Sequence, residues 1–134
     1  MKSLVLFAFL LLYNAPLDAQ LAPALVWDYE TAQDPLCTAA VTDDCVTAFE
    51  VFYYDASGEA VSAARVPASA GQVLSGSIWT WTIPVPQVPG PKYVVRRWFV
   101  RAIARAGGVE IVSEKSNELD VQQRPTPPRN LRGS

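Results

Sequence analysis

Histidine is absent from the 134 residues of the chain. The commonest general base and the commonest metal ligand of proteins are therefore missing, which weighs against hydrolase triads and zinc sites. Serines are present, but no Gly-x-Ser-x-Gly sequence accompanies them, and without such an arrangement no serine has an evident activating base. We therefore predict that the protein is not an enzyme and has no catalytic residues, no metal site and no cofactor.

The chain also lacks a strong net charge. Its formal charge of −2 gives no electrostatic reason to expect binding to nucleic acid. Hydrophobic residues make up 50% of the sequence and aromatic residues 10%, which is typical of a folded domain and not of a disordered chain. Without a leader, about 115 residues would remain, enough for one two-layer core. We expect a single domain.

A long apolar run occurs at the N-terminus. Lys2 precedes the uncharged residues 4–13, and a short polar stretch then ends in Leu17-Asp18-Ala19. This pattern is typical of a signal peptide cleaved after Ala19. The alternative is an uncleaved membrane anchor, which would need about 20 apolar residues. We expect a signal peptide over residues 1–19, no stable membrane span after cleavage, and a mature protein that is secreted, periplasmic or exposed at a surface.

Cysteine is scarce, because Cys37 and Cys45 are the only two. In the oxidising compartment that export implies, so close a pair indicates a disulfide that holds a loop. Closing such a short ring would stabilise the fold by about 2–3 kcal/mol on the loop-entropy argument. The spacing does not favour the alternative, a redox or metal pair.

No segment after the leader shows a sustained helical period, and alternation of apolar and polar residues dominates. The clearest strand covers residues 46–54 and ends at the turn sequence Asp-Ala-Ser-Gly. Residues 77–83 alternate, with Trp79, Trp81 and Ile83 on one face. We predict further strands at 25–27, 60–66, 93–104 and 118–122, an acidic loop over 28–44 and a Pro-rich connection over 84–91.

Six or so short strands separated by turns predict an all-β sandwich. Its core should collect the inward residues of these strands: Leu25, Trp27, Val46, Phe49, Val51, Tyr53, Trp81, Ile83, Trp98, Val100, Ala102, Leu119 and Val121.

Several short motifs follow one another in an order that suggests a family. They are Trp27 in the strand at 25–27 and Val46-x-x-Phe49-x-Val51-x-Tyr53 in the strand at 46–54, followed by three later motifs. The later motifs are Pro-Gly-Pro-Lys-Tyr over residues 89–93, Val-Arg-Ala over 100–102, and residues 113–118 after a glycine turn. Together these motifs resemble the fibronectin type III family. The resemblance covers residues 25–121 and is nearest to the short exported versions of bacteria and phages.

The resemblance implies an immunoglobulin-like sandwich of about six to seven strands over residues 20–123. The third and sixth strands should then be neighbours in one sheet. One departure from the family is the long interval between Tyr93 and the Val-Arg-Ala motif. Either a bulge lies near Arg96 and Arg97, or Tyr93 stays in the loop and Trp98 takes its position; we favour the second.

A second departure concerns the first strand. Only residues 20–24 precede the second strand, too few for a full first strand, so one sheet edge should be open. The Pro-rich tail, residues 124–134, resembles the opening of a following module and could complete the edge of another copy by β-strand addition. The alternative is a disordered tail or a severed linker. The candidate docking residues are Pro125, Pro127, Pro128 and Leu131.

Charged residues are unevenly distributed. Residues 20–60 hold eight acidic and no basic residues, whereas residues 61–134 hold ten basic and four acidic ones. Five of the acidic residues cluster in the loop region after the strand at 25–27, which could suggest a calcium site or a glycosidase pair. No Asp-x-Asp-x-Asp-Gly loop is present, however, and a solvated acidic loop is the better interpretation. The acidic residues concerned are Asp28, Glu30, Asp34, Asp43 and Asp44.

If Trp98 and Val100 point inward, their neighbours point outward beside Glu50 of the third strand. One interpretation is a set of cross-strand acid–base and aromatic pairs, each stabilising by about 0.2–1 kcal/mol. The other is an exposed apolar patch rimmed by arginines, which would suit a partner site. The candidate binding face comprises Phe52, Tyr54, Arg97, Phe99, Arg101 and Ile103.

These features predict an exported, non-catalytic binding or adhesion module that recognises an unknown protein or glycan through its exposed sheet face or loops. The alternative is a structural or assembly component of a virion or cell surface. In that case the Pro-rich tail docks on a neighbouring subunit, and the protein associates with itself.

Overall fold

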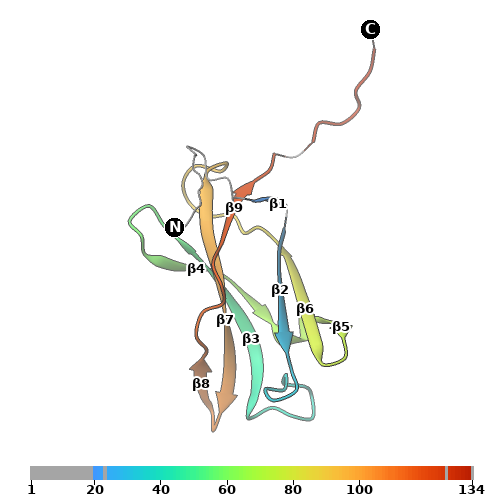
Figure 1. Cartoon of the computed structure of the whole chain (residues 1–134), viewed down its shortest axis with the longest axis vertical. Coiled ribbons are helices and arrows are strands. Elements are labelled where there is room, and N and C mark those ends of the chain that lie inside the picture. The colour runs from blue at the N-terminus through green and yellow to red at the C-terminus, as the bar shows by residue number, and fades with distance from the viewer. Residues whose placement is uncertain (1–19, 23, 126, 134) are drawn as a thin grey trace, which may run out of the picture.

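The computed structural model describes residues 20–22, 24–125 and 127–133, which form an all-β structure of two sheets (Figure 1). The predicted signal peptide lies outside these residues, and none of them belongs to a helix long and apolar enough to cross a membrane. A short 3-10 helix, η1, covers Ala68–Ala70. The strands are β1 (Gln20–Ala22), β2 (Ala24–Glu30), β3 (Cys45–Tyr54), β4 (Ala60–Pro67), β5 (Gln72–Ser75), β6 (Ile78–Pro84), β7 (Val95–Ala106), β8 (Val109–Val112) and β9 (Leu119–Gln123).

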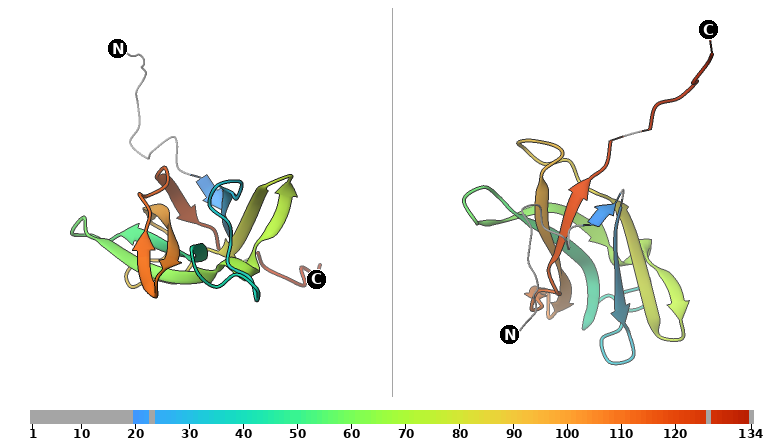
Figure 2. Two further views of the ribbon diagram at one scale, coloured as in Figure 1. Left: turned by 90° about the horizontal axis from the view of Figure 1, so that it is seen from below. Right: turned by 45° about the horizontal axis from the view of Figure 1, so that its top comes forward.

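The two sheets form the layers of a β-sandwich (Figure 2). The larger sheet has the order β1-β9-β7-β3-β4, with β8 paired to the end of β7, and the smaller sheet has the order β2-β6-β5. Strands β3 and β7 pair antiparallel from Cys45 opposite Arg105 to Tyr53 opposite Trp98. The expectation that the strands predicted at 46–54 and 93–104 are neighbours in one sheet is therefore confirmed.

Strand β3 forms because it is rich in β-branched and aromatic residues, and from Phe49 to Tyr54 every second residue points into the core. Phe49, Val51 and Tyr53 are buried against the smaller sheet. The strand ends at the predicted turn, where the Asp55 carboxylate accepts hydrogen bonds from the N–H groups of Ser57 (2.9 Å) and Glu59 (3.0 Å).

The core is built around tryptophan and phenylalanine rings from both layers. The Trp81 side chain is 1% exposed, and its ring centroid lies 4.4 Å from that of Phe49 and 6.4 Å from that of Trp27. Its Nε1–H donates to the Ala68 carbonyl at 3.3 Å. Most residues of the predicted core belong to this buried cluster, which also includes Val66 and Val85. The other predicted core residues are partly buried and pack against it: Trp27, Ile83, Val100 and Leu119.

The structure corrects several predicted boundaries. Strand β2 continues to Glu30, so Asp28 and Glu30 are strand residues and not part of an acidic loop. Strands β1, β5 and β8 were not predicted. Tyr93 stays in the loop before β7 and is 47% exposed, while Trp98 is buried, as we favoured.

The predicted disulfide is confirmed, because Cys37 and Cys45 are joined with their Cα atoms 4.9 Å apart. Backbone bonds hold the same loop against the start of β3. The Cys37 N–H donates to the Val46 carbonyl and the Val46 N–H donates to the Pro35 carbonyl, both at 2.8 Å. The bridge therefore fixes the chain that leads from the smaller sheet to the larger one.

Candidate functional site

The candidate binding face lies on the outer side of the larger sheet, as its alternation predicts. Phe52 on β3 is directly opposite Phe99 on β7. The two rings stack, with centroids 5.0 Å apart and planes inclined by 9°. Tyr54 packs against the same Phe99 ring at 5.5 Å. The structure thus brings the predicted aromatic residues of the two strands together.

The expected exposure of this patch is wrong at two positions, because Phe99 is 2% exposed and Ile103 is fully buried. The Lys115 ammonium lies 5.5 Å from the centre of the Phe99 ring, and the Arg101 guanidinium lies 5.4 Å from it. Long basic side chains cover apolar rings in this way while their charges remain in water. The Phe99 ring is therefore covered by charged side chains and is not an exposed apolar surface.

Ion pairs also connect the strands across this face. Arg97 bonds Asp120 at 2.8 Å, and Arg65 bonds Glu110 at 3.0 Å. These contacts correspond to the first of our two interpretations, in which cross-strand pairs stabilise the sheet. Whether the remaining exposed side chains of the face bind a partner stays a prediction.

Glu118 is the centre of one such cluster. Its carboxylate accepts hydrogen bonds from Lys115 at 2.7 Å and from the Tyr54 hydroxyl at 2.5 Å. These two bonds, the lysine's first, hold the pKa of Glu118 below its ordinary value. The same carboxylate, followed by Tyr54, raises the pKa of Lys115. The charges of this cluster are thus already paired within the chain.

Two of the acidic residues of the first half, Glu30 and Asp43, are hydrogen-bonded within the chain. Glu30 accepts hydrogen bonds from the Ser77 hydroxyl and the Ala32 N–H, and these bonds lower its pKa. Asp43 accepts a bond from the Gly107 N–H at 3.1 Å. A general acid of a glycosidase needs a raised pKa, so Glu30 is tuned in the opposite direction.

A different feature stands out at the edge of the smaller sheet. Among the described residues, no strand pairs with β2 on the side away from β6. The Thr31 N–H donates to the Ser77 carbonyl at 2.9 Å and so extends the β2–β6 register. In an antiparallel ladder bonded pairs alternate with non-bonded ones. The backbone groups of Val26 and Asp28 therefore point away from β6, toward the unpaired side.

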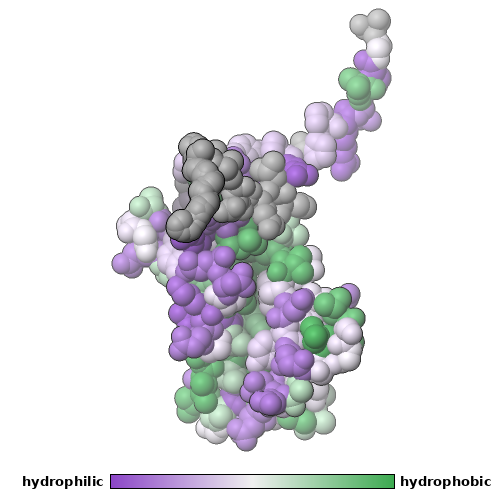
Figure 3. All heavy atoms as spheres, in the orientation of Figure 1, coloured by the Kyte–Doolittle hydropathy of each residue, from purple (hydrophilic) through white to green (hydrophobic). Residues whose placement is uncertain are grey.

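Beside this free edge lies a hollow of about 410 Å³ between the two sheets. Its apolar walls include Leu25 and Trp27 from β2, Trp98 from β7 and Leu119 from β9. A smaller hollow of about 170 Å³ continues it toward Tyr29, and Trp27, Asp28, Val100 and Ser116 line both. We call the two together the β2 groove. Figure 3 shows polar surface over β7 and β9, and apolar surface between these two strands and the smaller sheet.

The far wall of the β2 groove is the chain between β8 and β9, which follows β7 and not β2. The Ser113 N–H donates to the Ala102 carbonyl and the Ser116 N–H to the Val100 carbonyl, at 2.9 and 2.8 Å. The hydroxyl oxygens of the same two serines accept bonds from the Ala102 and Val100 N–H groups. These four bonds use the free edge of β7 and leave the edge of β2 unpaired.

The indole of Trp27 has an unsatisfied donor. Its Nε1 is shielded from solvent and has no hydrogen-bond partner among the described residues. Leaving a buried donor without an acceptor costs about 1–3 kcal/mol. Trp27 is also one of the residues that line both hollows of the groove.

Two other hollows each include a polar side chain that is hydrogen-bonded within the chain. A hollow of about 820 Å³ beside Tyr53 and the Pro-rich loop includes Arg96, whose guanidinium donates to the Pro89 and Pro91 carbonyls at 3.4 and 2.5 Å. One of about 420 Å³ near Trp79 includes Thr31, whose hydroxyl donates to the Ser77 carbonyl. The β2 groove lies beside the main-chain groups of Val26 and Asp28, which point toward a side of β2 where no described strand pairs.

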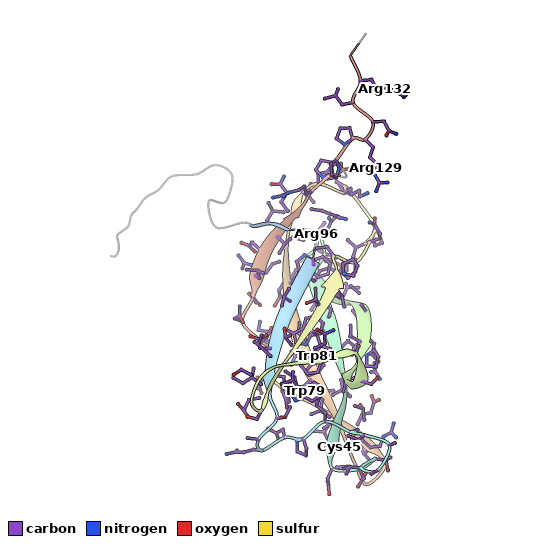
Figure 4. The ribbon with its side chains drawn as sticks, turned by 90° about the vertical axis from the view of Figure 1, so that its right-hand side faces the viewer. Cys45, Trp79, Trp81, Arg96, Arg129 and Arg132 are labelled. Atoms are coloured by element: carbon purple, nitrogen blue, oxygen red, sulfur yellow. A yellow bond between two sulfur atoms is a disulfide. The ribbon has the colours of Figure 1, made fainter. Side chains whose placement is uncertain are left out.

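The tail lies apart from these surfaces. Beyond β9 the chain runs away from the sandwich (Figure 1), and Figure 4 shows Arg129 and Arg132 well beyond its end. The Leu131 side chain is completely exposed. The predicted docking residues Pro125, Pro127 and Pro128 precede it on the same extension.

No protein-family model, curated protein or solved structure matches the chain significantly.

Proposed function

We propose that the protein is an exported, non-catalytic binding module that holds an extended segment of a partner protein along the free edge of β2. The observation that carries this proposal is the unpaired edge of β2 beside an apolar groove between the sheets. Export is proposed from the N-terminal sequence, which has the pattern of a signal peptide.

The domain class that we propose is the fibronectin type III sandwich. The pairing of β3 with β7 in one sheet and of β2 with β6 in the other supports it. The first strand is short, because β1 pairs only with Val121, Gln122 and Gln123 of β9. In the proposed class this leaves β2 without a neighbour along most of its length.

A polypeptide suits this site because an unpaired strand edge recognises main chain. The outward backbone groups of Val26 and Asp28 can each exchange hydrogen bonds with an added strand. Alternate side chains of that strand would enter the apolar groove beside Trp27 and Leu119. From Leu25 to Tyr29 the edge is about 15 Å long at roughly 3.3 Å per residue, so it accommodates about five residues of partner.

The outer face of the larger sheet is a weaker candidate for the partner site. Its aromatic residues are largely covered, and its charged groups bond one another across the strands. A partner there would have to replace these internal pairs, whereas a strand at β2 would satisfy groups that have no partner strand. We therefore favour a protein over a glycan as the ligand.

The proposal can be tested with a random-dodecapeptide display library panned against the whole chain. The variant Asn117→Trp places an indole from an exposed position into the groove, and Thr42→Trp adds the same side chain at an exposed loop position away from it. We expect the wild type and Thr42→Trp to enrich the same peptides and Asn117→Trp to lose them. Equal enrichment by all three proteins, or none by the wild type, would contradict the proposal.

A further inference from the structure

The β2 groove and the C-terminal tail have complementary chemistry. We propose that the tail of one copy of the protein occupies the β2 groove of a second copy, so that the chain assembles with itself. This inference rests on the proposed function, because it names the partner of the same groove.

Leu131 is the first reason. It is a large apolar side chain that no part of the described structure covers, on a tail that otherwise consists of polar, proline and glycine residues. A single exposed leucine is common on protein surfaces, but this one lies on an extension with the means to form a strand. The groove offers Leu25, Trp98 and Leu119 as an apolar wall against which it can pack.

The backbone of the tail is the second reason. Proline cannot donate to a ladder, so Pro125, Pro127 and Pro128 act as a stiff spacer. Residues 129–133 follow without proline, and each has an N–H group that can donate. Five such residues match the length of β2 edge that lines the groove. Asn130 has a φ of 60° in the tail as it stands, so docking requires a change at this residue, which asparagine tolerates.

Charge complementarity is the third reason. Residues 124–133 contain arginines and no acidic residue. The outer side of β2 carries the exposed acids Asp28 and Glu30, and Glu114 lines the opposite rim of the groove. Lys115 also lies on that rim, but its ammonium is paired with Glu118 at 2.7 Å. A basic segment would therefore be attracted to this edge, and salt would weaken the attraction.

The position of the tail favours a second copy over the same chain. The tail continues in the direction of β9, away from the sandwich, whereas the groove follows β2 in the opposite direction (Figures 1 and 2). Strand β1 lies on the outer edge of β9, at the end where the tail departs. To reach its own groove the tail would have to reverse its direction within its proline spacer and pass β1.

Such an interface joins two different surfaces, a tail and a groove. Each copy then offers one of each, and a contact of this kind produces rings if it closes and open chains if it does not. The protein should therefore form assemblies that grow with concentration.

The test is sedimentation velocity of the whole chain over a wide range of concentration. Leu131→Asp removes the apolar anchor, and Ala39→Asp adds the same charge at an exposed loop position outside both the tail and the groove. Asn117→Trp fills the groove, and Thr42→Trp is its control. We expect the wild type and both controls to associate, and Leu131→Asp and Asn117→Trp to sediment as single chains.

Mixing the two impaired variants gives the decisive arm. Leu131→Asp keeps an intact groove and Asn117→Trp keeps an intact tail, so an equimolar mixture should form a dimer with one molecule of each. A wild type that sediments as one chain, or a Leu131→Asp variant that associates like the wild type, would overturn the inference.

The failure of this inference can be distinguished from the failure of the proposed function. If the wild type is a single chain but still captures display peptides that Asn117→Trp loses, the groove binds a foreign segment and only the tail assignment is wrong. If Asn117→Trp alters neither association nor peptide capture, both proposals fail.

Discussion

Gly71 lies against the central ring of the core, and replacing it with alanine should destabilise the protein. A Cβ atom at this position would lie 2.4 Å from Cε2, 2.6 Å from Cζ2 and 2.7 Å from Nε1 of Trp81. Contacts this short require the indole to move. The backbone itself would tolerate alanine, because φ at Gly71 is −79°, so the whole penalty comes from packing.

The magnitude follows from what surrounds Trp81. The ring is confined by Phe49 and Trp27, and overpacking a confined core costs about 1–3 kcal/mol. Displacing the indole also endangers its bond to the Ala68 carbonyl, which would leave a buried donor at a cost of about 1–3 kcal/mol. In the opposite direction, alanine stabilises the protein by about 0.4–1 kcal/mol, because it restricts the conformations of the unfolded chain more than glycine does. We expect a net loss of about 2 kcal/mol.

Urea unfolding followed by tryptophan fluorescence measures this loss directly. Each 1 kcal/mol lowers the melting temperature of a domain of this size by about 4–8 °C, so a thermal scan gives a second reading. Gly133→Ala is the matched control, because nothing lies within 4 Å of the added Cβ atom. If Gly71→Ala unfolds together with the wild type and leaves the near-ultraviolet dichroism of the tryptophans unchanged, the packing of Trp81 described here is incorrect.

Two further predictions concern the outer face of the larger sheet. Phe99→Ala should lower the free energy of unfolding by about 3–5 kcal/mol, because a buried phenylalanine is removed. Phe52→Ala should lower it less, because Phe52 is only half-buried. Equal losses in urea unfolding would contradict the burial of Phe99. Stability should also depend on pH through Glu118, whose pKa is lowered in the folded chain by Lys115 and Tyr54. The contribution of Glu118 to stability is present above the ordinary carboxyl pKa of 4.5 and is lost as pH falls through its lowered pKa in the folded chain. In melting curves recorded from pH 6 downward, Glu118→Gln should therefore lose less stability than the wild type as the pH falls.

Local patterning was sufficient to predict most of the sandwich. Trp79, Trp81 and Ile83 alternate with polar residues, so the face of β6 that enters the core could be assigned from the sequence. The β-branched and aromatic residues of β3 gave its extent to within one residue. These assignments depend on neighbours in the chain, and period-two alternation records them directly.

What the sequence could not provide depends on distant partners. Strand β1 exists only through its pairing with β9, and β5 is exposed along its whole length, so neither has an apolar pattern of its own. The alternation correctly pointed Phe99 outward, but its cover comes from Lys115, which belongs to the chain after β8. Sequence spacing cannot show that a later segment returns to this ring.

The β2 groove was predicted only in part for the same reason. The small number of residues before Ala24 indicated an open edge. The hollow beside that edge, however, exists because Ser113 and Ser116 attach their segment to β7. No local pattern distinguishes a serine that binds the edge of β7 from one that faces water.

The most direct test of the β2 groove is amide hydrogen exchange in the Leu131→Asp chain, with and without a peptide captured from the display library. The amides of Val26 and Asp28 point toward the unpaired side of β2, whereas that of Trp27 belongs to the β2–β6 ladder. We expect the peptide to slow exchange at Val26 and Asp28 and to leave exchange at Trp27 nearly unchanged. Unaltered exchange at both residues, with protection appearing on another strand, would contradict it.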